Sequence, residues 1–266
     1  SISDLPADSK DKRDSLFQNP FAPTDLGGFQ LGFSISHFPI FEGLSGSCRG
    51  KEVLWKSRID STALLVNALQ RCAAPPKLFV CASAIGIYGN RGDEVLSEES
   101  ELGHGFLADL GRAWESAAAA APTQVVHARF GVVLSRAGGA LAKMHLPFKL
   151  GLGGRLGSGR QFMSWISLED AVAAIYWMVS ARALSGPVNV VAPAPVRNSE
   201  FTRALGRALG RPTLFPAPVF ALRMALGEMA DEALLSSQRV EPGKLLAADF
   251  TFSLPDVDSA LSAELG

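Results

Sequence analysis

Hydrophobic residues recur along this chain at two spacings, one typical of helices and one typical of buried strands. Between Trp55 and Leu69 they return every three or four positions, which predicts an amphipathic helix over about residues 51–71. A pair of prolines at 75–76 ends this unit. The next run, LFVC at 78–81, is apolar without a break, as expected for a parallel strand that is buried on both faces.

Helix and strand patterns continue to alternate along the rest of the chain. Helices are predicted at 106–121, 139–150, 170–180 and 198–209, with shorter ones near 220–226, 230–236 and 256–265. Strands are predicted at 124–129, 162–166 and 187–191. This order is that of βαβ units, so the predicted fold class is α/β, with a parallel sheet flanked by helices.

Residues 1–50 are the exception, because Pro, Asp, Ser, Gly and scattered Phe follow no sustained period there. Residues 29–41 alternate in part and are compatible with one strand. We expect part of this stretch to be loop or disordered, and the first 50 residues to be mobile.

Composition narrows the classes of function. The chain has 266 residues, 47% of them hydrophobic, which suffices for one main domain. A net charge of −1 offers no basic field for nucleic acid. Three cysteines form neither a metal-ligand cluster nor a disulfide framework, which favours a reducing compartment. With no apolar run of about 20 residues and no signal-peptide core, we expect no membrane partner and a cytoplasmic location, or alternatively an organelle stroma or matrix.

The predicted strand at 77–82 ends in a segment that is typical of ligand sites. Small residues follow the strand, and Ser83 and Tyr88 stand among them. Because ligands of open α/β sheets bind at the carboxyl ends of strands, this segment predicts a site. The alternative is a strand that ends in an ordinary turn.

A glycine-rich loop at 151–159 matches a nucleotide-binding loop only in its spacing. Gly151, Gly154 and Gly157 fit G-x-x-G-x-x-G. They follow a predicted helix and lead into an extended segment, whereas a phosphate loop follows a strand and opens a helix. We therefore expect a flexible loop that borders a pocket. Arg160, directly after it, either binds a phosphate or carboxylate or is an ordinary surface arginine.

Other polar residues have simpler expected roles. Asp170 and Asn198 stand at the starts of predicted helices and are expected to cap them. Arg58 lies among apolar residues of the first helix, and it is either solvated or reaches a phosphate. The histidines share no ligand spacing, so no metal site is expected.

Several longer motifs resemble a known family. They are SAIGIYG at 83–89, RFGVVL at 129–134, LPFKLGLGGRLGSGRQ at 146–161 and SWISLED at 164–170. These motifs resemble extended short-chain dehydrogenase/reductases, in particular the atypical branch of nucleoside-diphosphate-sugar epimerase-like proteins. Its C-terminal extension is similar to residues 216–240 and the F-x-F at 250–252. The likeness covers about residues 50–265.

The resemblance implies an incomplete Rossmann-like fold that binds NADP or NAD and a small, nucleotide-sugar-like substrate. It implies a divergent or poorly ordered segment at 1–49, an NAD(P)-binding core at 50–192 with a substrate-side insertion at 138–166, and a small substrate subdomain at 193–266. Ser83 would hydrogen-bond a substrate oxygen and Tyr88 would line the pocket, as the two catalytic candidates. The residues implied to lie near the cofactor are Arg58, Ala82, Phe130, Gly131 and Val132, and those near the substrate are Arg160, Gln161, Ser164 and Trp165.

The chain departs from typical members of this superfamily in two ways. The helix after the active serine usually carries Tyr-x-x-x-Lys; here Phe106 and Leu107 stand near the tyrosine position and no lysine follows, as in this branch as a whole. Relatives begin with a strand and G-x-x-G-x-x-G, which residues 1–50 replace, either as a divergent start or as a truncated product. Without this pyrophosphate cradle we expect weak or no NADP(H) binding.

The predicted function is therefore an NAD(P)-dependent oxidoreductase or epimerase activity on a nucleotide-sugar-like substrate, impaired by loss of the dinucleotide loop. The alternative is a non-catalytic binding or regulatory protein that retains the fold. In either case we expect one cleft at the carboxyl edge of the sheet, with the C-terminal extension as a wall. Its expected lining residues are Ser83, Tyr88, Phe130, Gly131, Arg160 and Trp165.

Overall fold

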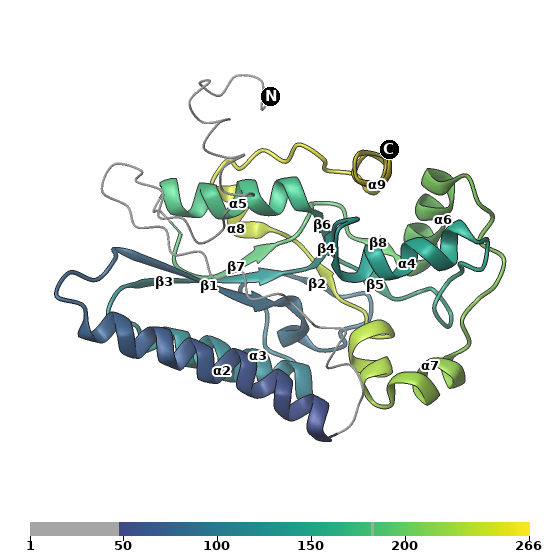
Figure 1. Cartoon of the computed structure of the whole chain (residues 1–266). Coiled ribbons are helices and arrows are strands. Elements are labelled where there is room, and N and C mark those ends of the chain that lie inside the picture. Colours follow the sequence, from purple (N-terminus) through teal and green to yellow (C-terminus); the bar gives the residue numbers. More distant parts are fainter. Residues whose placement is uncertain (1–47, 182–183) are drawn as a thin grey trace. The chain divides into compact units, whose positions relative to one another are not determined.

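The computed structural model describes residues 48–181 and 184–266, which lie within one compact unit, Ile40–Gly266. The strand expected within 29–41 lies outside the described residues, and so does all but residues 48–50 of the segment expected to be mobile. Within the described part, helices and strands alternate along the chain as the sequence predicts (Figure 1).

A parallel sheet of three strands forms the centre of this unit. In spatial order its strands are β1 (Leu78–Ala84), β3 (Gln124–Phe130) and β7 (Gly186–Val190). Helix α3 (Phe106–Ala119) connects β1 to β3, and α5 (Leu168–Ala181) precedes β7. Such crossovers are what parallel pairing requires. The predicted α/β class, with a parallel sheet flanked by helices, is confirmed.

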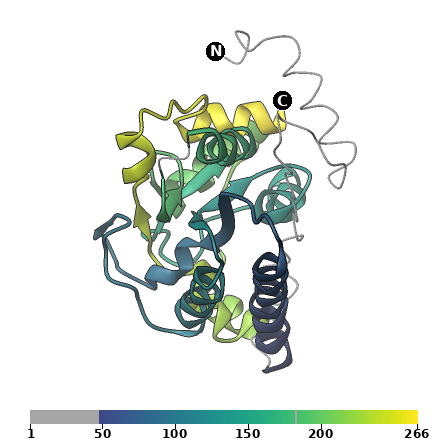
Figure 2. The same cartoon turned by 90° about the vertical axis from the view of Figure 1, so that its left-hand side faces the viewer.

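Helices cover both faces of the central sheet. On one face α3 contacts β1 and β3, and α2 (Cys48–Arg71) packs against α3 (Figures 1 and 2). On the opposite face lies α5. The buried positions of α2 are four residues apart and include Leu54, Arg58 and Val66. This spacing places them on one side of the helix. The helix is amphipathic as predicted, but its buried side differs from the predicted one at Trp55, which is 38% exposed.

The hydrophobic core is divided by the sheet. The cluster on the α5 side includes Val126, Val188 and Met178, all fully buried. The cluster on the α3 side includes Cys81 and Trp114. Burial there raises the pKa of Cys81 to about 12, which fits a packing role and not a reactive thiol.

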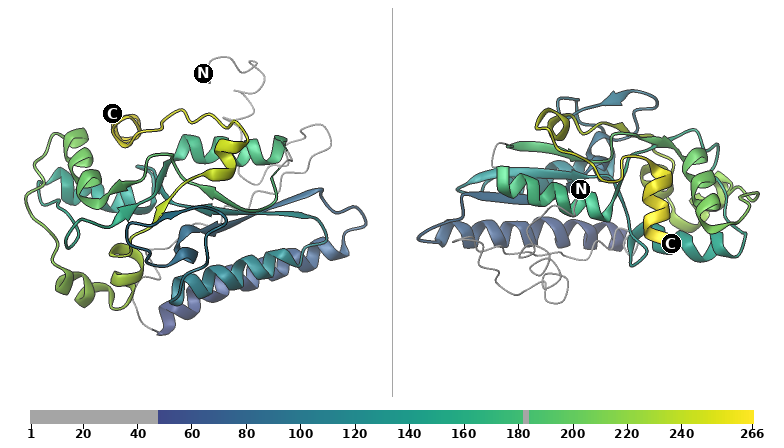
Figure 3. Two further views of the ribbon diagram at one scale, coloured as in Figure 1. Left: turned by 180° about the vertical axis from the view of Figure 1, so that it is seen from behind. Right: turned by 90° about the horizontal axis from the view of Figure 1, so that it is seen from above.

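Shorter elements complete the unit, and most of them gather beyond the arrowheads of the central strands (Figures 1 and 3). They are the 3₁₀ turn η2 (Ile85–Tyr88), β2 (Val95–Leu96), β4 (Val132–Leu134), α4 (Gly139–Lys149), β5 (Phe162–Met163), β6 (Trp165–Ser167), β8 (Val196–Arg197), α6 (Asn198–Leu209), α7 (Val219–Leu226), the π-helical turn η3 (Ala230–Leu234), β9 (Arg239–Val240), α8 (Gly243–Ala247) and α9 (Val257–Leu265). The short strands pair as β2 with β9 and β4 with β6, both parallel, and β5 with β8, antiparallel. A second core, around Trp165 and Phe201, packs β4, β6, α4, α6 and α9 together. Residues of η2, β2 and β9 form a smaller cluster, and α8 packs against β7.

Asn198 does not cap its helix as expected. Arg197 is the capping residue of α6, and its N–H donates to the carboxylate of Glu200 at 2.7 Å. Asn198 is the first helical residue, and its amide oxygen accepts the N–H of Leu156 at 2.8 Å. Its side chain therefore holds the glycine-rich loop, a long-range contact that a local sequence pattern does not reveal.

The expectation for Asp170 also needs correction. At the start of α5 the hydroxyl of Ser167 accepts the Asp170 N–H at 3.0 Å, so Ser167 is the cap. The fully buried Asp170 carboxylate accepts the N–H groups of Ser253 and Leu254, at 2.7 and 3.0 Å. Asp170 thus connects α5 to the C-terminal segment.

Candidate functional site

Three polar residues form a row across the central sheet near the carboxyl ends of its strands. In the strand register Ser83 of β1 pairs with Arg129 of β3, which in turn pairs with Asn189 of β7. Their exposed fractions are 0%, 4% and 0%. Polar side chains at such buried positions must find hydrogen-bond partners, and apolar residues would avoid that requirement. The row is therefore a candidate site.

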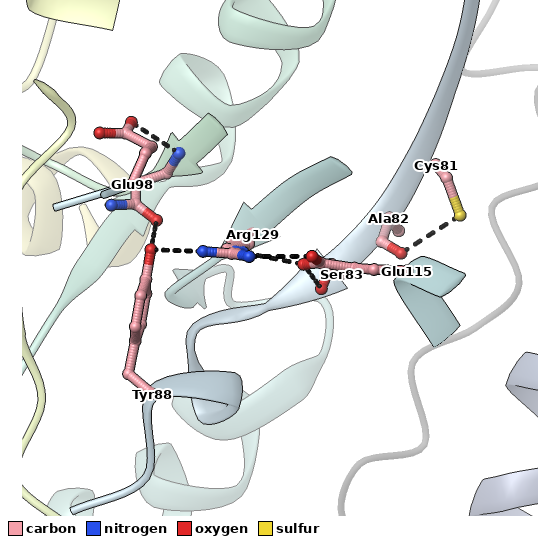
Figure 4. A network of polar contacts seen from close by, with 8 residues as sticks. Cys81, Ala82, Ser83, Tyr88, Glu98, Glu115 and Arg129 are labelled. Carbon is pink, nitrogen blue, oxygen red and sulfur yellow. Dashed lines mark hydrogen bonds and ion pairs between the residues drawn. The ribbon is translucent and has the colours of Figure 1, made fainter. Parts of the chain in front are cut away.

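Glu115 of α3 joins the first two residues of the row (Figure 4). The Ser83 hydroxyl donates to Oε1 of Glu115 at 2.7 Å. Arg129 donates from Nε to the same oxygen at 2.8 Å and from Nη2 to Oε2 at 2.9 Å. This two-pronged geometry is the strong form of a guanidinium–carboxylate contact. Because the Ser83 hydroxyl donates its hydrogen bond to Glu115, the Ser83 oxygen can only accept a hydrogen bond from a ligand.

Tyr88 continues the connections toward β7. Nη1 of Arg129 donates to the Tyr88 hydroxyl at 2.9 Å, and that hydroxyl donates to Oδ1 of Asn189 at 2.7 Å. The backbone N–H of Asn189 then donates to Glu98 at 3.0 Å. We call the following residues the polar row: Ser83, Glu115, Arg129, Tyr88, Asn189 and Glu98.

Burial and neighbouring charge shift the pKa values of Tyr88 and Arg129 in the polar row. Burial raises the pKa of Tyr88, although Arg129 and Asn189 oppose the rise. Burial disfavours the Arg129 cation, but the hydrogen bonds and charge of Glu115, together with Tyr88, outweigh it and raise the pKa of Arg129. Tyr88 is itself fully buried, and its hydroxyl donates a hydrogen bond to Asn189. Its role as an acid or base stays a prediction, which requires this arrangement to open.

A second cluster gathers arginines around Phe162 of β5. The guanidinium carbon of Arg197 lies 4.4 Å from the centre of the Phe162 ring, and that of Arg239 lies 5.1 Å from it. Arg197 donates to both carboxylate oxygens of Asp93, at 3.3 and 3.0 Å, and to the carbonyl of Arg160. We call these five residues, Phe162, Arg160, Arg197, Arg239 and Asp93, the arginine cluster.

The arginine cluster has more positive charge than its one carboxylate balances. The hydrogen bond from Arg197 lowers the pKa of Asp93, and the charges of Arg160 and Arg239 add to the effect. Within the described part of the chain, Nε of Arg239 is buried without a hydrogen-bond partner. Guanidinium groups in such a setting favour phosphate or carboxylate ligands.

The turn that follows Tyr88 connects the polar row to the segment that carries the arginine cluster. The Gly89 carbonyl accepts a hydrogen bond from Gln238 at 3.2 Å. Ser237, the preceding residue, accepts the N–H of Phe162 through its hydroxyl at 2.9 Å. The arginine cluster therefore adjoins the segment that leaves β1 at its carboxyl end. The single cleft expected from the sequence is not tested by these contacts and stays a prediction.

Three residues expected near the substrate are hydrogen-bonded inside the protein. Gln161, Ser164 and Trp165 are all buried. Nε2 of Gln161 donates to two backbone carbonyls at 3.2 Å each, and the Ser164 hydroxyl accepts the Val240 N–H at 2.8 Å. Nε1 of Trp165 donates to the Ala194 carbonyl at 3.0 Å. These side chains hold neighbouring segments together, and their contact with a substrate stays a prediction.

The residues expected near the cofactor lie on β1, β3, β4 and α2. Arg58 is buried, with its guanidinium carbon 5.6 Å from the centre of the Trp114 ring, so the solvated alternative is wrong. Ala82 lies within β1, Phe130 ends β3 and Val132 begins β4. Between those last two, Gly131 leaves no room for a side chain, because a Cβ would lie 2.6 Å from the Ser164 carbonyl oxygen. Their contact with a cofactor remains a prediction.

Two places in the described part were candidates for a pyrophosphate cradle. The start of α3 already holds a carboxylate, since the N–H groups of Phe106 and Leu107 donate to Glu232 at 3.1 and 2.8 Å. The glycine motif at 151–157 lies between α4 and β5, as predicted, and so does not open a helix. Neither place fits the pyrophosphate of a dinucleotide.

Two other kinds of site were searched for in residues 48–181 and 184–266. No group of three or more His, Cys, Asp and Glu side chains there is arranged to hold a metal ion. None of the helices in this part is long and apolar enough to cross a membrane.

The sequence did not predict four members of the polar row: Glu115, Arg129, Asn189 and Glu98. A weak signal for two of them is present, because Arg129 and Asn189 each interrupt an apolar strand near its end. Glu115 stands in an alanine-rich helix, and Glu98 lies in a loop with several other glutamates, a composition that is typical of a solvated segment. Only the strand register and the packing of α3 show that these residues meet.

Comparisons with known proteins match most of the chain. A family described as a domain of unknown function, DUF1731, matches residues 217–264. An epimerase family protein of Mycobacterium leprae is 48% identical over 215 residues, which cover 80% of this chain and 69% of that protein. An epimerase family protein of Bacillus subtilis is 36% identical and covers 86% of this chain, with 78% of its own length matched.

Two solved structures resemble the chain at comparable identity. The crystal structure of human epimerase family protein SDR39U1 with NADPH has a TM-score of 0.80 and 34% identity, covering 82% of this chain and 75% of that one. The nucleoside-diphosphate sugar epimerase from Corynebacterium glutamicum has a TM-score of 0.66 and 35% identity, covering 83% of this chain and 44% of that one. The central sheet and the segments around it are therefore arranged as in these proteins.

Proposed function

Because the chain belongs to the epimerase family, the atypical branch of the extended short-chain dehydrogenase/reductases, we propose that it acts as an NAD(P)-dependent oxidoreductase or epimerase. The proposed substrate is nucleotide-sugar-like. The observation that carries this proposal is the arginine cluster, in which Arg160, Arg197 and Arg239 surround one exposed carboxylate. A diphosphate would replace Asp93 as their partner and would reach the unpaired Nε of Arg239.

The polar row would provide the substrate's second contact. The Ser83 hydroxyl donates a hydrogen bond to Glu115. The Ser83 oxygen is therefore left as an acceptor and would accept a hydrogen bond from a sugar O–H. Arg129 holds Glu115 in place through two hydrogen bonds. Ser83 is fully buried, so this contact requires the residues that cover it to move.

NADP or NAD would supply the hydride chemistry when bound. The solved human relative contains NADPH. In this chain the start of α3 is filled by Glu232, and the glycine loop does not open a helix. We propose that NADP(H) affinity is weak, because each missing N–H contact to a charged phosphate forgoes about 1.5–3 kcal/mol.

A second candidate function is a non-catalytic binding protein. It is favoured by the helix α3, which carries Phe106 and Leu107 where typical enzymes of the superfamily carry a tyrosine. It is also favoured by Tyr88, whose hydroxyl is fully used within the protein. Such a protein would bind the nucleotide sugar without turnover.

Calorimetric titration with UDP-glucose tests the substrate half of the proposal. We expect Arg239→Ala to weaken binding about tenfold or more, since it removes a charge-assisted contact. Asp93→Asn should tighten binding, because the ligand then displaces no carboxylate. Arg71→Ala is the matched control, an exposed arginine at the end of α2 and outside the cluster. Equal affinity in all three variants and in the parent chain would overturn the proposed anion site.

Fluorescence titration with NADPH tests the cofactor half. Weak or absent binding, together with UDP-glucose binding, is the expected result. Micromolar NADPH affinity would contradict the proposed impairment and would support a fully working enzyme. Turnover of UDP-glucose with added NADP or NAD separates the enzyme from the binding protein.

A further inference from the structure

Large apolar side chains are exposed where α4, α6 and α7 lie together at one end of the described unit (Figures 1 and 3). Helix α7 has the sequence VFALRMAL, yet none of its residues is buried. We call the following residues the apolar face, with their exposed fractions: Leu146 62%, Leu150 65%, Leu152 61%, Leu214 73%, Phe215 60%, Phe220 67% and Met224 84%. Single exposed apolar residues are ordinary, whereas several on adjoining segments are a candidate interaction surface.

Backbone contacts show that these residues belong to one region. The loop after α4 runs along the segment before α7, where Leu156 and Ala217 form a bridge. Gly154 packs so closely on Phe215 that a Cβ would lie 2.0 Å from the Phe215 carbonyl oxygen. Phe220 and Met224 are one turn apart on α7, so they lie on the same side of that helix.

The two stretches of chain that carry the apolar face are rich in basic residues. Residues 137–168 and 201–227 contain no Asp or Glu. Their basic residues are Lys143, Lys149, Arg155, Arg160, Arg203, Arg207, Arg211 and Arg223. Arg207 and Arg223 pair with aspartates. Among the ion pairs of the described part, none involves Lys149, Arg155, Arg203 or Arg211.

An open hollow at the end of α6 adds a place for a phosphate group. Its volume is about 450 Å³, and Arg203, Arg207 and Arg211 line it. The chain leaves this hollow directly into Leu214 and Phe215 of the apolar face. In a phospholipid layer the charged phosphates lie next to the hydrocarbon chains. Cations that line a hollow beside exposed apolar side chains could contact both parts at once.

We propose that this region binds the surface of an anionic phospholipid bilayer. The apolar face would enter the interface between headgroups and acyl chains, and the unpaired arginines would contact the phosphates. Nucleic acid would leave the exposed leucines and Met224 without partners. A second copy of this face would bring unpaired cations of like sign together. The expectation of no membrane partner considered spanning segments only, and surface binding needs no such segment.

Flotation with phospholipid vesicles tests this proposal on the full chain. One vesicle type is phosphatidylcholine alone, and the other is phosphatidylcholine and phosphatidylglycerol in equal parts. We expect binding to the second type, weaker at high salt. Arg155→Glu with Arg211→Glu should reduce it about tenfold or more, as should Phe220→Ser with Met224→Ser. These side chains are exposed, so the fold should tolerate the changes.

A matched control changes the same residue types elsewhere. Leu64→Ser with Arg71→Glu alters exposed positions of α2 and should leave vesicle binding unchanged. No binding to anionic vesicles, or equal binding by all variants, would overturn the proposal. Sedimentation velocity and titration with a single-stranded oligonucleotide complete the test. A dimer that the Phe220 and Met224 changes abolish would assign the apolar face to a second copy and overturn the proposal. Oligonucleotide binding that Arg155→Glu with Arg211→Glu abolishes, without vesicle binding, would assign the arginines to nucleic acid and likewise overturn it.

Discussion

At the scale of single residues, the polar row poses an energetic question. Arg129 and Glu115 have side-chain exposures of only 4% and 13%. Removing such charges from water costs several kcal/mol each, by an order-of-magnitude estimate, and a well-packed apolar pair is often as stable. The pair is therefore weak evidence for stability by itself. The pair also fixes the orientation of the Ser83 and Tyr88 hydroxyl groups, because each of them is hydrogen-bonded to one of its members.

A double-mutant cycle measures how strongly this pair is coupled. Glu115→Leu should lower the free energy of unfolding by about 3–5 kcal/mol, because Arg129 remains as a buried unpaired cation. Arg129→Met should cost a similar amount, whereas the double variant should cost clearly less than the sum. The measurement is urea unfolding at neutral pH. The exposed pair Arg207–Asp258 is the control, with an expected coupling of about 0.5 kcal/mol or less. Additive losses at Glu115 and Arg129 would show that the contact is not formed.

At the scale of elements, the sequence predicted the long helices and the central strands because their apolar periods are long. It missed β2, β8 and β9, which have two residues each and therefore no period. It also assigned caps from local residue type, so Asp170 and Asn198 were interpreted without their distant partners. Ser83 and Tyr88 were found because they follow a strand, whereas Arg129 and Asn189 needed the register.

Asp170 offers a test of such a long-range element contact. Asp170→Asn keeps the shape of the side chain but removes the charge that accepts the N–H groups of Ser253 and Leu254. We expect a loss of about 1.5–3 kcal/mol in the free energy of unfolding, as for hydrogen bonds to charged groups. Amide hydrogen exchange should become faster at Ser253 and Leu254 while β1 and β3 keep their protection.

The control for this prediction is Asp256→Asn, in the same C-terminal segment as Ser253 and Leu254. Asp256 caps α9 and accepts the Ser259 N–H at 2.9 Å. Asparagine is about as good a cap as aspartate, so this change should be nearly neutral. If both variants lost the same stability, the effect would come from charge near the C-terminal segment and not from the contacts of Asp170.

At the scale of the whole described unit, the C-terminal segment is interleaved with the rest. β9 pairs with β2, and Ser164 holds the Val240 N–H. Leu245 and Phe250 belong to the core beside the sheet. The expected division into a core at 50–192 and a subdomain at 193–266 stays a prediction. These contacts favour a single folding unit, because each part buries residues of the other.

Truncation separates these two possibilities. A chain that ends at residue 216 loses the strand partner of β2, the partner of Asp170 and two residues of the core beside the sheet. We expect it to lack a cooperative unfolding transition, because exposing that core forfeits several kcal/mol by the cost of core truncation. In the full chain, tryptophan fluorescence and far-ultraviolet circular dichroism should report one coincident transition in urea. A truncated chain that kept its own sharp transition would instead identify the C-terminal segment as a separate domain, and the full chain would then unfold in two steps.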